Sequence, residues 1–286
     1  MNRRALALLL LLAPVLVWLL GLIVIPQIDL AILSLRERTG VREHAFSLAQ
    51  YATFFGESSY WRSFLRTALM SLLATACTLA IAFPVAWHVA KVAQGRVRMA
   101  LLVALLVPFW ASETVRSLGW MLLLRESGVL PQGLLALGLV SEAPELLYHD
   151  ATILTGLVYT SLLFMVVPLI GVFETLDNSL LEASYDLGGS RWPTLRHIVI
   201  PHAAPGIAAG CIVVFMLAVG NYLTPNLLGG KNSHWFTEAI YDQFIVRSNW
   251  EQGAAFGLLL LGLSSAIVWV GLKLTGQQLG QVMRRT

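Results

Sequence analysis

A glutamate and an arginine lie three residues apart inside a long apolar segment of this sequence. Glu113 and Arg116 share one face of a helix at this spacing, so their side chains can pair with each other. Trp110 and Trp120 flank them, and a carboxylate beside aromatic rings can hold a cation. The alternative is that Arg116 only neutralises Glu113 and that both residues brace the packing of helices. The residue types leave both interpretations open.

The elements that must position these residues are membrane spans. The chain has 286 residues, of which 57% are hydrophobic and 12% are charged, whereas soluble proteins have roughly 45–50% apolar and about 25% charged residues. An apolar run of about 20 residues crosses the hydrocarbon core as a helix. We expect one transmembrane helix in each of six runs, which are Ala5–Ile25, Phe64–Val89, Met99–Leu124, Ile153–Val172, Gly206–Leu228 and Ala254–Thr275. The sequence therefore predicts an all-α membrane protein with six transmembrane helices.

Basic residues beside the expected spans indicate their orientation. Arg3 and Arg4 precede the first run, and Lys91 and Arg191 flank later runs on the same side. The positive-inside rule assigns this side to the cytoplasm, so we expect both termini there. The first run is longer than the roughly 7–15 apolar residues of a secretory signal, which favours a retained span. No linker divides the chain, and we expect a single transmembrane domain over residues 1–286.

Polar residues inside membrane spans are functional candidates, because an ionised side chain at mid-bilayer costs roughly 2.5–3.5 kcal/mol on insertion scales. Asn221 and Tyr222 come shortly before Pro225, where the missing backbone donor should break a helix. Asp242 lies in a polar segment further on, where a carboxylate suits a cationic solute or a docking partner. The candidate substrate path therefore consists of Trp110, Glu113, Arg116, Trp120, Asn221, Tyr222 and Asp242.

The segment between the fourth and fifth runs carries the capping signals of two short helices. Asp177 suits the start of the first helix, and Gly188 suits its left-handed end. Ser190 can begin a second helix, which we expect to end at Pro201. We take residues 174–204 as a cytoplasmic loop within the transmembrane domain. A long, structured polar insert of this kind is typical of contact with a partner outside the membrane.

The first of these helices has an acidic polar face. Its charges are those of Asp177, Glu182 and Asp186, whereas a helix that lies on lipid would favour Lys and Arg. Leu180 and Tyr185 could fill an apolar socket on a partner protein while Glu182 pairs with a cation there. The pattern favours docking to a protein over docking to lipid.

This loop resembles the signature of ATP-binding-cassette (ABC) importer permeases, which reads Glu-Ala-Ala, three residues, Gly, nine residues, Ile-x-Leu-Pro. The residues that match at the same spacing are Glu182, Ala183, Gly188, Ile198 and Pro201. Ser184 stands where the second Ala is usual, and Ile200 replaces Leu. Both replacements keep a small or an aliphatic side chain, so they leave the pattern intact.

The resemblance implies a type I ABC importer permease, with six transmembrane helices and both termini in the cytoplasm. In that family the loop is the coupling helix that sits in a cleft of the cytoplasmic ATPase. The implied ATPase-coupling residues are Glu182, Ala183, Ser184, Tyr185, Gly188, Ile198 and Pro201. The chain itself would be no enzyme and would bind no cofactor or metal, because ATP and Mg belong to the partner ATPase subunits.

The partners that the resemblance implies are a second permease subunit in a heterodimer, two cytoplasmic ATPase subunits, a periplasmic solute-binding protein and membrane lipid. The location it implies is the bacterial inner membrane. Alternating access would then move a small solute through a path of which this subunit forms half.

Further matches are similar to the spermidine/putrescine branch of these permeases. The stretch from Ala82 to Trp87 ends the second run as in that branch, and the third run shares its pattern at Pro108, Ser112 and Arg116. The implied cargo is a polyamine such as spermidine or putrescine. Because the branch also contains importers of opines, amino-phosphonates and other small solutes, such cargoes remain alternatives.

Other classes of function fit the sequence less well. Gly230-Lys231 is followed by Asn232 and lacks a glycine five residues earlier, so it is no phosphate-binding loop. The formal net charge of +3 comes without a basic stripe that has interleaved aromatics, so nucleic-acid binding has no support. An ion-coupled secondary transporter remains the main rival, since kinked spans with paired charges suit that mechanism too.

Overall fold

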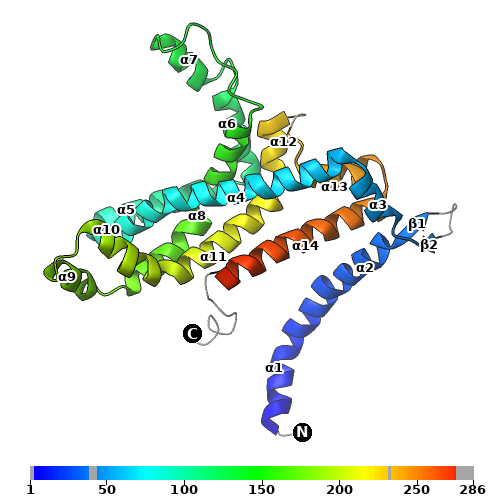
Figure 1. Ribbon diagram of the computed structural model, residues 1–286, viewed down its shortest axis with the longest axis horizontal. Helices are drawn as coiled ribbons and strands as arrows, with labels where there is room; N and C mark the ends of the chain where they lie inside the picture. The colour runs from blue at the N-terminus through cyan, green and yellow to red at the C-terminus, as the bar shows by residue number, and fades with distance from the viewer. Residues whose placement is uncertain (1–2, 39–43, 231–232, 275–286) are drawn as a thin grey trace. The chain divides into compact units, whose positions relative to one another are not determined.

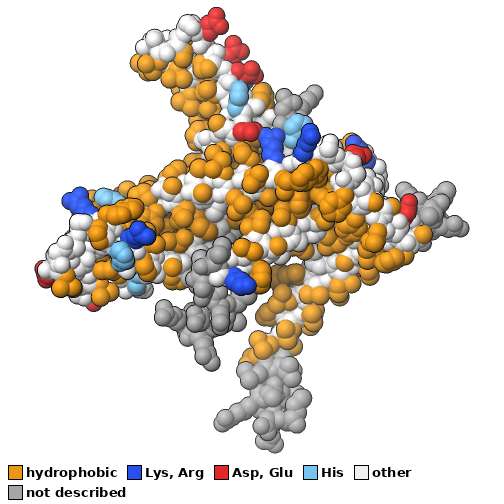
Figure 2. Space-filling view, viewed as in Figure 1, with side chains coloured by type: hydrophobic (Ala, Val, Ile, Leu, Met, Phe, Trp, Pro, Cys, Tyr) orange, Lys and Arg blue, Asp and Glu red, His pale blue; other side chains and the backbone are white. Residues whose placement is uncertain are grey.

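The computed structural model describes residues 3–38, 44–230 and 233–274, and most of them are helical (Figure 1). Lys231, Asn232 and Thr275 lie outside the described residues. Five helices of the described part are long and apolar enough to cross a membrane, or six if one bent pair counts as a single span. The expected all-α membrane architecture is therefore confirmed. Figure 2 shows that hydrophobic side chains dominate the surfaces of the long helices.

The chain divides into two compact units. The first comprises Met1–Phe64 with Glu238–Leu263, and the second comprises Leu65–Thr237 with Ser264–Thr286. The single domain expected from the sequence stays a prediction.

The first unit begins with a helix that is longer than the first predicted span. Its consecutive parts are α1 (Arg3–Leu19), the π-helical turn η1 (Leu20–Val24) and α2 (Ile25–Ser34). Pro26 lies in the first turn of α2, where the wider π turn has already interrupted the regular hydrogen-bond pattern and the missing N–H is tolerated. The helix therefore continues past the expected end at Ile25.

Short elements and the ends of longer helices complete the first unit. They are the antiparallel strands β1 (Arg36–Arg38) and β2 (His44–Phe46), α3 (Ala49–Gly56), η6 (Asp242–Val246) and parts of α4 (Ser58–Trp87), α13 (Phe236–Tyr241) and α14 (Trp250–Leu274). Aromatic packing holds this unit together, because Phe54 of α3 is buried and meets Phe256 of α14 edge to face at 5.8 Å between ring centroids.

The second unit contains most of the membrane-length helices. Its elements in chain order are α4 (Ser58–Trp87), η2 (His88–Val92), α5 (Gly95–Leu106), η3 (Val107–Trp110), α6 (Glu113–Leu124), α7 (Val129–Ala136), α8 (Asp150–Thr175), α9 (Asn178–Asp186), α10 (Arg191–Thr194), η4 (Leu195–Val199), α11 (Ile200–Val219) and α12 (Leu223–Gly229).

The core of the second unit lies where α4, α8 and α11 pack together. Met165 and Phe173 of α8 are fully buried in one apolar cluster with Ala86 of α4 and Val214 of α11. Gly210 of α11 makes the close approach possible, because a Cβ at this position would lie 2.6 Å from the Met165 sulfur. Small residues of this kind drive helix packing in membranes.

The third predicted span, Met99–Leu124, is a broken helix and not a straight one. The helical segment Gly95–Trp110 and the segment Glu113–Ala136 meet at an angle of 94°. Pro108 lies in the 3₁₀ turn η3 at the end of the first segment, and it removes a backbone donor there. Ser112 then starts α6, because its Oγ accepts a hydrogen bond from the Val115 N–H at 3.3 Å. A stop and a new cap within a few residues produce the bend.

The fifth predicted span, Gly206–Leu228, is also interrupted, but the break precedes Pro225. α11 ends at Val219 and α12 starts at Leu223. The Asn221 Oδ1 accepts a hydrogen bond from the Thr224 N–H at 2.9 Å, as a capping side chain does. Pro225 follows within the first turn of α12, where a missing N–H costs little. The break therefore lies between Val219 and Leu223, before the proline.

The helix that starts at Arg191 does not end at Pro201, contrary to the sequence-based expectation. α10, η4 and α11 form one continuous helix, Arg191–Val219, of 29 residues. Pro201 lies in the first turn of α11, directly after the π turn η4. The widened turn removes the hydrogen bond that the proline ring would have blocked, so the helix passes through.

Candidate functional site

The two helix breaks of the second unit meet through the side chain of Glu113. Glu113 is the first residue of α6, and its Oε1 accepts a hydrogen bond from the Asn221 Nδ2 at 2.6 Å. The Thr224 hydroxyl donates to the same oxygen at 3.3 Å. The other oxygen, Oε2, has no hydrogen-bond partner within residues 44–230 and 233–274. One oxygen is therefore held in place while the other is available to a ligand.

Two further polar contacts lie beside this site. The Thr237 hydroxyl donates to the Asn221 carbonyl at 2.8 Å. The hydroxyls of Ser117 and Thr224 lie 3.4 Å apart, and both residues are buried. The Asn221 side chain thus connects α6 to the capped start of α12. A carboxylate that is oriented by fixed donors between two interrupted helices is an arrangement that membrane transporters use for binding sites.

Arg116 does not pair with Glu113, although the sequence allowed it. Among the described residues no ion pair joins them, and the Arg116 guanidinium lies over the Phe109 ring at 4.5 Å from its centroid. Its Nε and Nη1 are buried and have no hydrogen-bond partner in the described part of the chain. The aromatic face stabilises this cation in place of a carboxylate.

The other predicted path residues occupy different surroundings. Trp110 is 88% exposed at the end of η3, whereas Trp120 packs edge to face on Tyr159 with ring centroids 5.6 Å apart. Tyr222 precedes α12 and is half-buried. Asp242 is exposed and belongs to the first unit. The structure therefore brings Glu113 and Asn221 together directly, and it places Trp120 in a packing role.

The predicted coupling loop begins with a capped helix. The Asp177 carboxylate accepts a hydrogen bond from the Ser179 N–H at 3.0 Å and so caps α9. The backbone and side-chain hydrogen bonds from Ser179 hold the pKa of the Asp177 carboxyl below its usual value, and the nearby Lys91 charge acts in the same direction. Gly188 ends the turn after α9 with φ of +82°, which confirms the left-handed position expected there.

A hydroxyl pair joins the two helices of this loop. The Ser184 Oγ lies 2.8 Å from the Thr194 Oγ1, and Thr194 is buried. Gly189 allows the tight turn, because a Cβ there would lie 2.6 Å from the Ser184 carbonyl oxygen. The replacement of the family's usual Ala by Ser184 therefore adds a contact between α9 and α10.

The coupling residues divide into an exposed set and a packed set. Ala183 and Pro201 are exposed, as are Glu182, Tyr185 and Gly188, whereas Ser184 is half-buried. Ile198 packs against the apolar core of the second unit, as does Leu181. The large exposed apolar side chains of the loop are those of Leu180, Tyr185, Leu187, Trp192 and Ile200. Exposed apolar side chains gathered on one structured loop make it a candidate docking surface.

Sequence reasoning missed two basic residues that hold this loop. Lys91 Nζ donates to the Leu176 carbonyl and, at 3.1 Å, to the Asn178 Oδ1. Arg98 forms an ion pair with Glu174. The residues of each pair lie far apart in the sequence. The sequence shows only that basic residues occur between the second and third spans, and it does not show which residues they contact.

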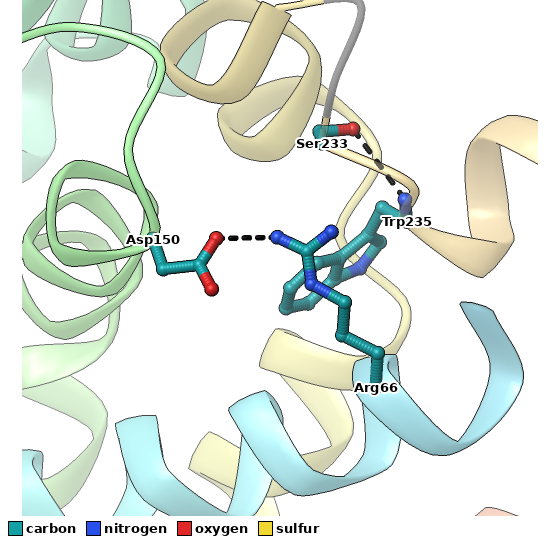
Figure 3. Close-up of polar contacts among 4 residues, drawn as sticks. All are labelled: Arg66, Asp150, Ser233 and Trp235. Atoms are coloured by element: carbon teal, nitrogen blue, oxygen red, sulfur yellow. Dashed lines mark hydrogen bonds and ion pairs between the residues drawn. The ribbon is translucent and has the colours of Figure 1, made fainter. Parts of the chain in front are cut away.

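A third missed contact lies at the opposite end of α8. Arg66 of α4 forms an ion pair with Asp150, the first residue of α8 (Figure 3). Trp235 is also buried, and its backbone N–H donates to the Ser233 hydroxyl at 3.4 Å (Figure 3). A carboxylate in the first turn suits the helix dipole, so the pair joins α4 to the start of α8.

Membrane-length helices, two interrupted spans that meet at a carboxylate, and an exposed structured loop together define a membrane transport subunit. A family model described as "Binding-protein-dependent transport system inner membrane component" matches residues 4–274. The chain belongs to this family, and it is a permease subunit of an ABC importer in the inner membrane. The predicted family is confirmed, and the ion-coupled secondary transporter is set aside.

Several permease proteins are similar in sequence to this chain. The spermidine/putrescine transport system permease protein PotB of Salmonella typhimurium strain LT2 is 35% identical over 240 residues, which cover 83% of each chain. PotB of Escherichia coli K12 is 36% identical over 227 residues, or 78% of this chain and 82% of the relative. The inner membrane ABC transporter permease protein YdcU of the same strain is 34% identical over 236 residues, or 78% and 75%.

Solved structures share the fold. The chain matches a bacterial alginate ABC transporter in complex with an alginate pentasaccharide-bound periplasmic protein, with a TM-score of 0.79, 17% identity and coverage of 97% of this chain and 98% of that one. A second crystal structure of a bacterial importer of alginate gives a TM-score of 0.75, 17% identity and coverage of 96% of both chains. At this identity the likeness establishes the type I permease architecture alone.

Proposed function

We propose that this permease imports a small organic cation, of which spermidine and putrescine are the leading examples. The observation that carries the proposal is the Glu113 carboxylate, with one oxygen fixed by Asn221 and Thr224 and the other without a partner in the described residues. Arg116 is held on Phe109 and leaves this charge available to an ammonium group. The names of the PotB relatives support the same class of cargo.

In this proposal the cargo binds weakly and transiently to the Glu113 carboxylate. A primary ammonium group can donate to a carboxylate and lie against aromatic rings. Because cargo must leave as readily as it enters, a single carboxylate with one available oxygen suits passage better than a closed cage. The candidate path residues Glu113, Asn221 and Tyr222, with Trp110 nearby in sequence, would supply this contact, and Asp242 would attract cations or a partner elsewhere on the chain.

One observation favours a second candidate cargo. The buried Nε and Nη1 atoms of Arg116 have no hydrogen-bond partner in the described residues, and a guanidinium fork binds carboxylate or phosphonate groups well. A solute that carries both an amine and an acid, such as an opine or an amino-phosphonate, would use Glu113 and Arg116 together.

In this proposal other subunits hydrolyse the ATP that drives transport and complete the importer. The chain is no ATPase, and ATP and Mg would bind two cytoplasmic ATPase subunits that grip residues 174–204. A second permease subunit would complete the path as a heterodimer, and a periplasmic binding protein would deliver the cargo. Closure of the ATPases would then move the permease pair between two states of access.

The docking surface of the loop is tested by the substitution Leu180→Asp. Leu180 is 50% exposed on α9, so a charge there leaves the fold intact but places a carboxylate in an apolar socket. We expect the ATPase to bind this variant roughly 30-fold more weakly, the effect of losing one hot-spot residue. The measurement is the affinity of purified ATPase for the permease in nanodiscs. The matched control is Val129→Asp on α7, which is also exposed and should leave the affinity unchanged.

The cargo is tested by uptake in the complete importer, reconstituted in liposomes with its binding protein. We expect ATP-dependent uptake of spermidine or putrescine, and no uptake when either ATP or the binding protein is left out. An opine and an amino-phosphonate are tested alongside. Uptake of these acids without uptake of a polyamine would overturn the cation proposal in favour of the second candidate.

A further inference from the structure

We propose that the α4–α5 connection, residues 88–98, is a second route by which movement of α9 reaches the membrane helices, with Lys91 as the positioning residue that holds α9 to it. The inference rests on the proposed role of α9 as the contact of the ATPase. It assigns a function to two contacts that the transport path and the docking surface do not use.

Lys91 holds the junction between α8 and α9. Its Nζ donates to the Leu176 carbonyl and to the Asn178 Oδ1, the latter at 3.1 Å. Leu176 caps the C-terminal end of α8, where carbonyl oxygens lack partners within the helix and attract a cation. The Leu176 side chain is 2% exposed and belongs to the core cluster of α4, α8 and α11. The junction is therefore fixed from both its backbone and its side chain.

Arg98, seven residues after Lys91, adds a second contact between this connection and α8. It lies in the first turn of α5 and forms an ion pair with Glu174 in the last turn of α8. Both side chains are partly exposed, at 39% and 42%, so the pair contributes little stability by itself. Its effect is geometric, because together with Lys91 it ties the α4–α5 connection to α8 and α9 at two points.

These contacts connect α9 to the membrane helices in two ways. On its C-terminal side the chain continues through α10 into the helix that ends at Val219, directly before the break that holds Asn221. On its N-terminal side Lys91 of η2 holds the α8–α9 junction, and Arg98 of α5 holds the last turn of α8. α5 then runs to the break after which Glu113 begins α6. A displacement of α9 therefore acts on both sides of the Glu113–Asn221 contact.

The test compares Lys91→Met, Lys91→Arg and Arg96→Met in the complete importer in nanodiscs and liposomes. Methionine keeps the apolar stem of Lys91 and removes its donors, whereas arginine restores charge and donors. Arg96 is exposed on the same connection, and the described residues give its side chain no hydrogen bond or ion pair, so it is the matched control. The readout is the number of ATP molecules hydrolysed for each solute molecule transported, measured with the amount of ATPase that co-purifies.

We expect Lys91→Met to raise the ATP used per solute roughly threefold to tenfold, as the loss of a charge-assisted hydrogen bond would, while the ATPase stays bound. Lys91→Arg and Arg96→Met should keep the wild-type ratio. A wild-type ratio in Lys91→Met overturns the proposal, even if less protein reaches the membrane. The docking variant Leu180→Asp distinguishes failure of this proposal from failure of the proposed role of α9. If the ATPase still binds Leu180→Asp, the role of α9 as its contact is wrong. If Leu180→Asp loses the ATPase but Lys91→Met keeps the wild-type ratio of ATP to solute, only the second route is overturned.

Discussion

Replacing Glu113 with glutamine should lower uptake of a polyamine about tenfold or more, since the loss of one carboxylate–ammonium contact is worth at least about 1.4 kcal/mol at this depth. Glutamine keeps the shape of the side chain, and its carbonyl oxygen can still accept from Asn221 and Thr224. The link between α6 and α12 is therefore preserved and only the charge is removed. The measurement is ATP-driven uptake in liposomes, with the ATPase activity that the loaded binding protein stimulates.

The matched control is Ser117→Ala, which alters the same hydrogen-bonded cluster without changing its charge. Ser117 lies 3.4 Å from the Thr224 hydroxyl, a long contact, so uptake should stay within about twofold of the wild type. Stimulated ATPase activity should persist in both variants, because neither alters the loop at residues 174–204. Wild-type uptake in Glu113→Gln would remove the carboxylate from the transport path.

Replacing Gly188 with valine should uncouple ATP hydrolysis from uptake. The left-handed conformation at φ of +82° costs a residue with a Cβ about 1–2 kcal/mol, and a β-branched side chain fits it worst. An added Cβ would meet no atom within 4 Å, so the whole effect comes from the backbone. Because this turn orients α9 against α10, we expect uptake to fall at least about tenfold while ATP hydrolysis continues.

Gly188→Asn is the control for this effect, because asparagine tolerates the left-handed region. It should retain most of the uptake, and circular dichroism should show the same helix content in both variants. Equal loss of uptake in the two variants would point to the side chain and not to the backbone conformation. Normal uptake in Gly188→Val would show that the geometry of this turn does not control coupling.

The sequence alone predicts the loop well because its signals are local. Asp177 caps α9 and Gly188 adopts the left-handed conformation, as their residue types indicate. The spans were found because each apolar run is long enough to be read without knowledge of its neighbours. The prediction that the helix ends at Pro201 was wrong, because the π turn that allows a proline inside the helix has no signature in the residue types.

The polar site was predicted in part. Glu113 and Asn221 were singled out one by one, but their contact joins residues 108 positions apart, and no periodicity reports such a pairing. The break before α12 was placed at Pro225, whereas in the structure it lies earlier, where the Asn221 side chain accepts from the Thr224 N–H. Helix spacing allowed Arg116 to pair with Glu113, whereas in the structure the Arg116 guanidinium lies over the Phe109 ring. Tertiary contacts therefore decided what local rules left open.

The continuous helix from Arg191 to Val219 sets the scale of motion that the site can experience. Its 29 residues correspond to a rod about 43 Å long, so a tilt of about 5° around the loop end displaces the other end by about 4 Å. That displacement exceeds the 2.6 Å between Asn221 Nδ2 and Glu113 Oε1, and Asn221 lies two residues beyond the tip of the rod. A small rotation at the loop is therefore enough to break the hydrogen bond from Asn221 to the Glu113 carboxylate, without any bending of the helix between the loop and Asn221.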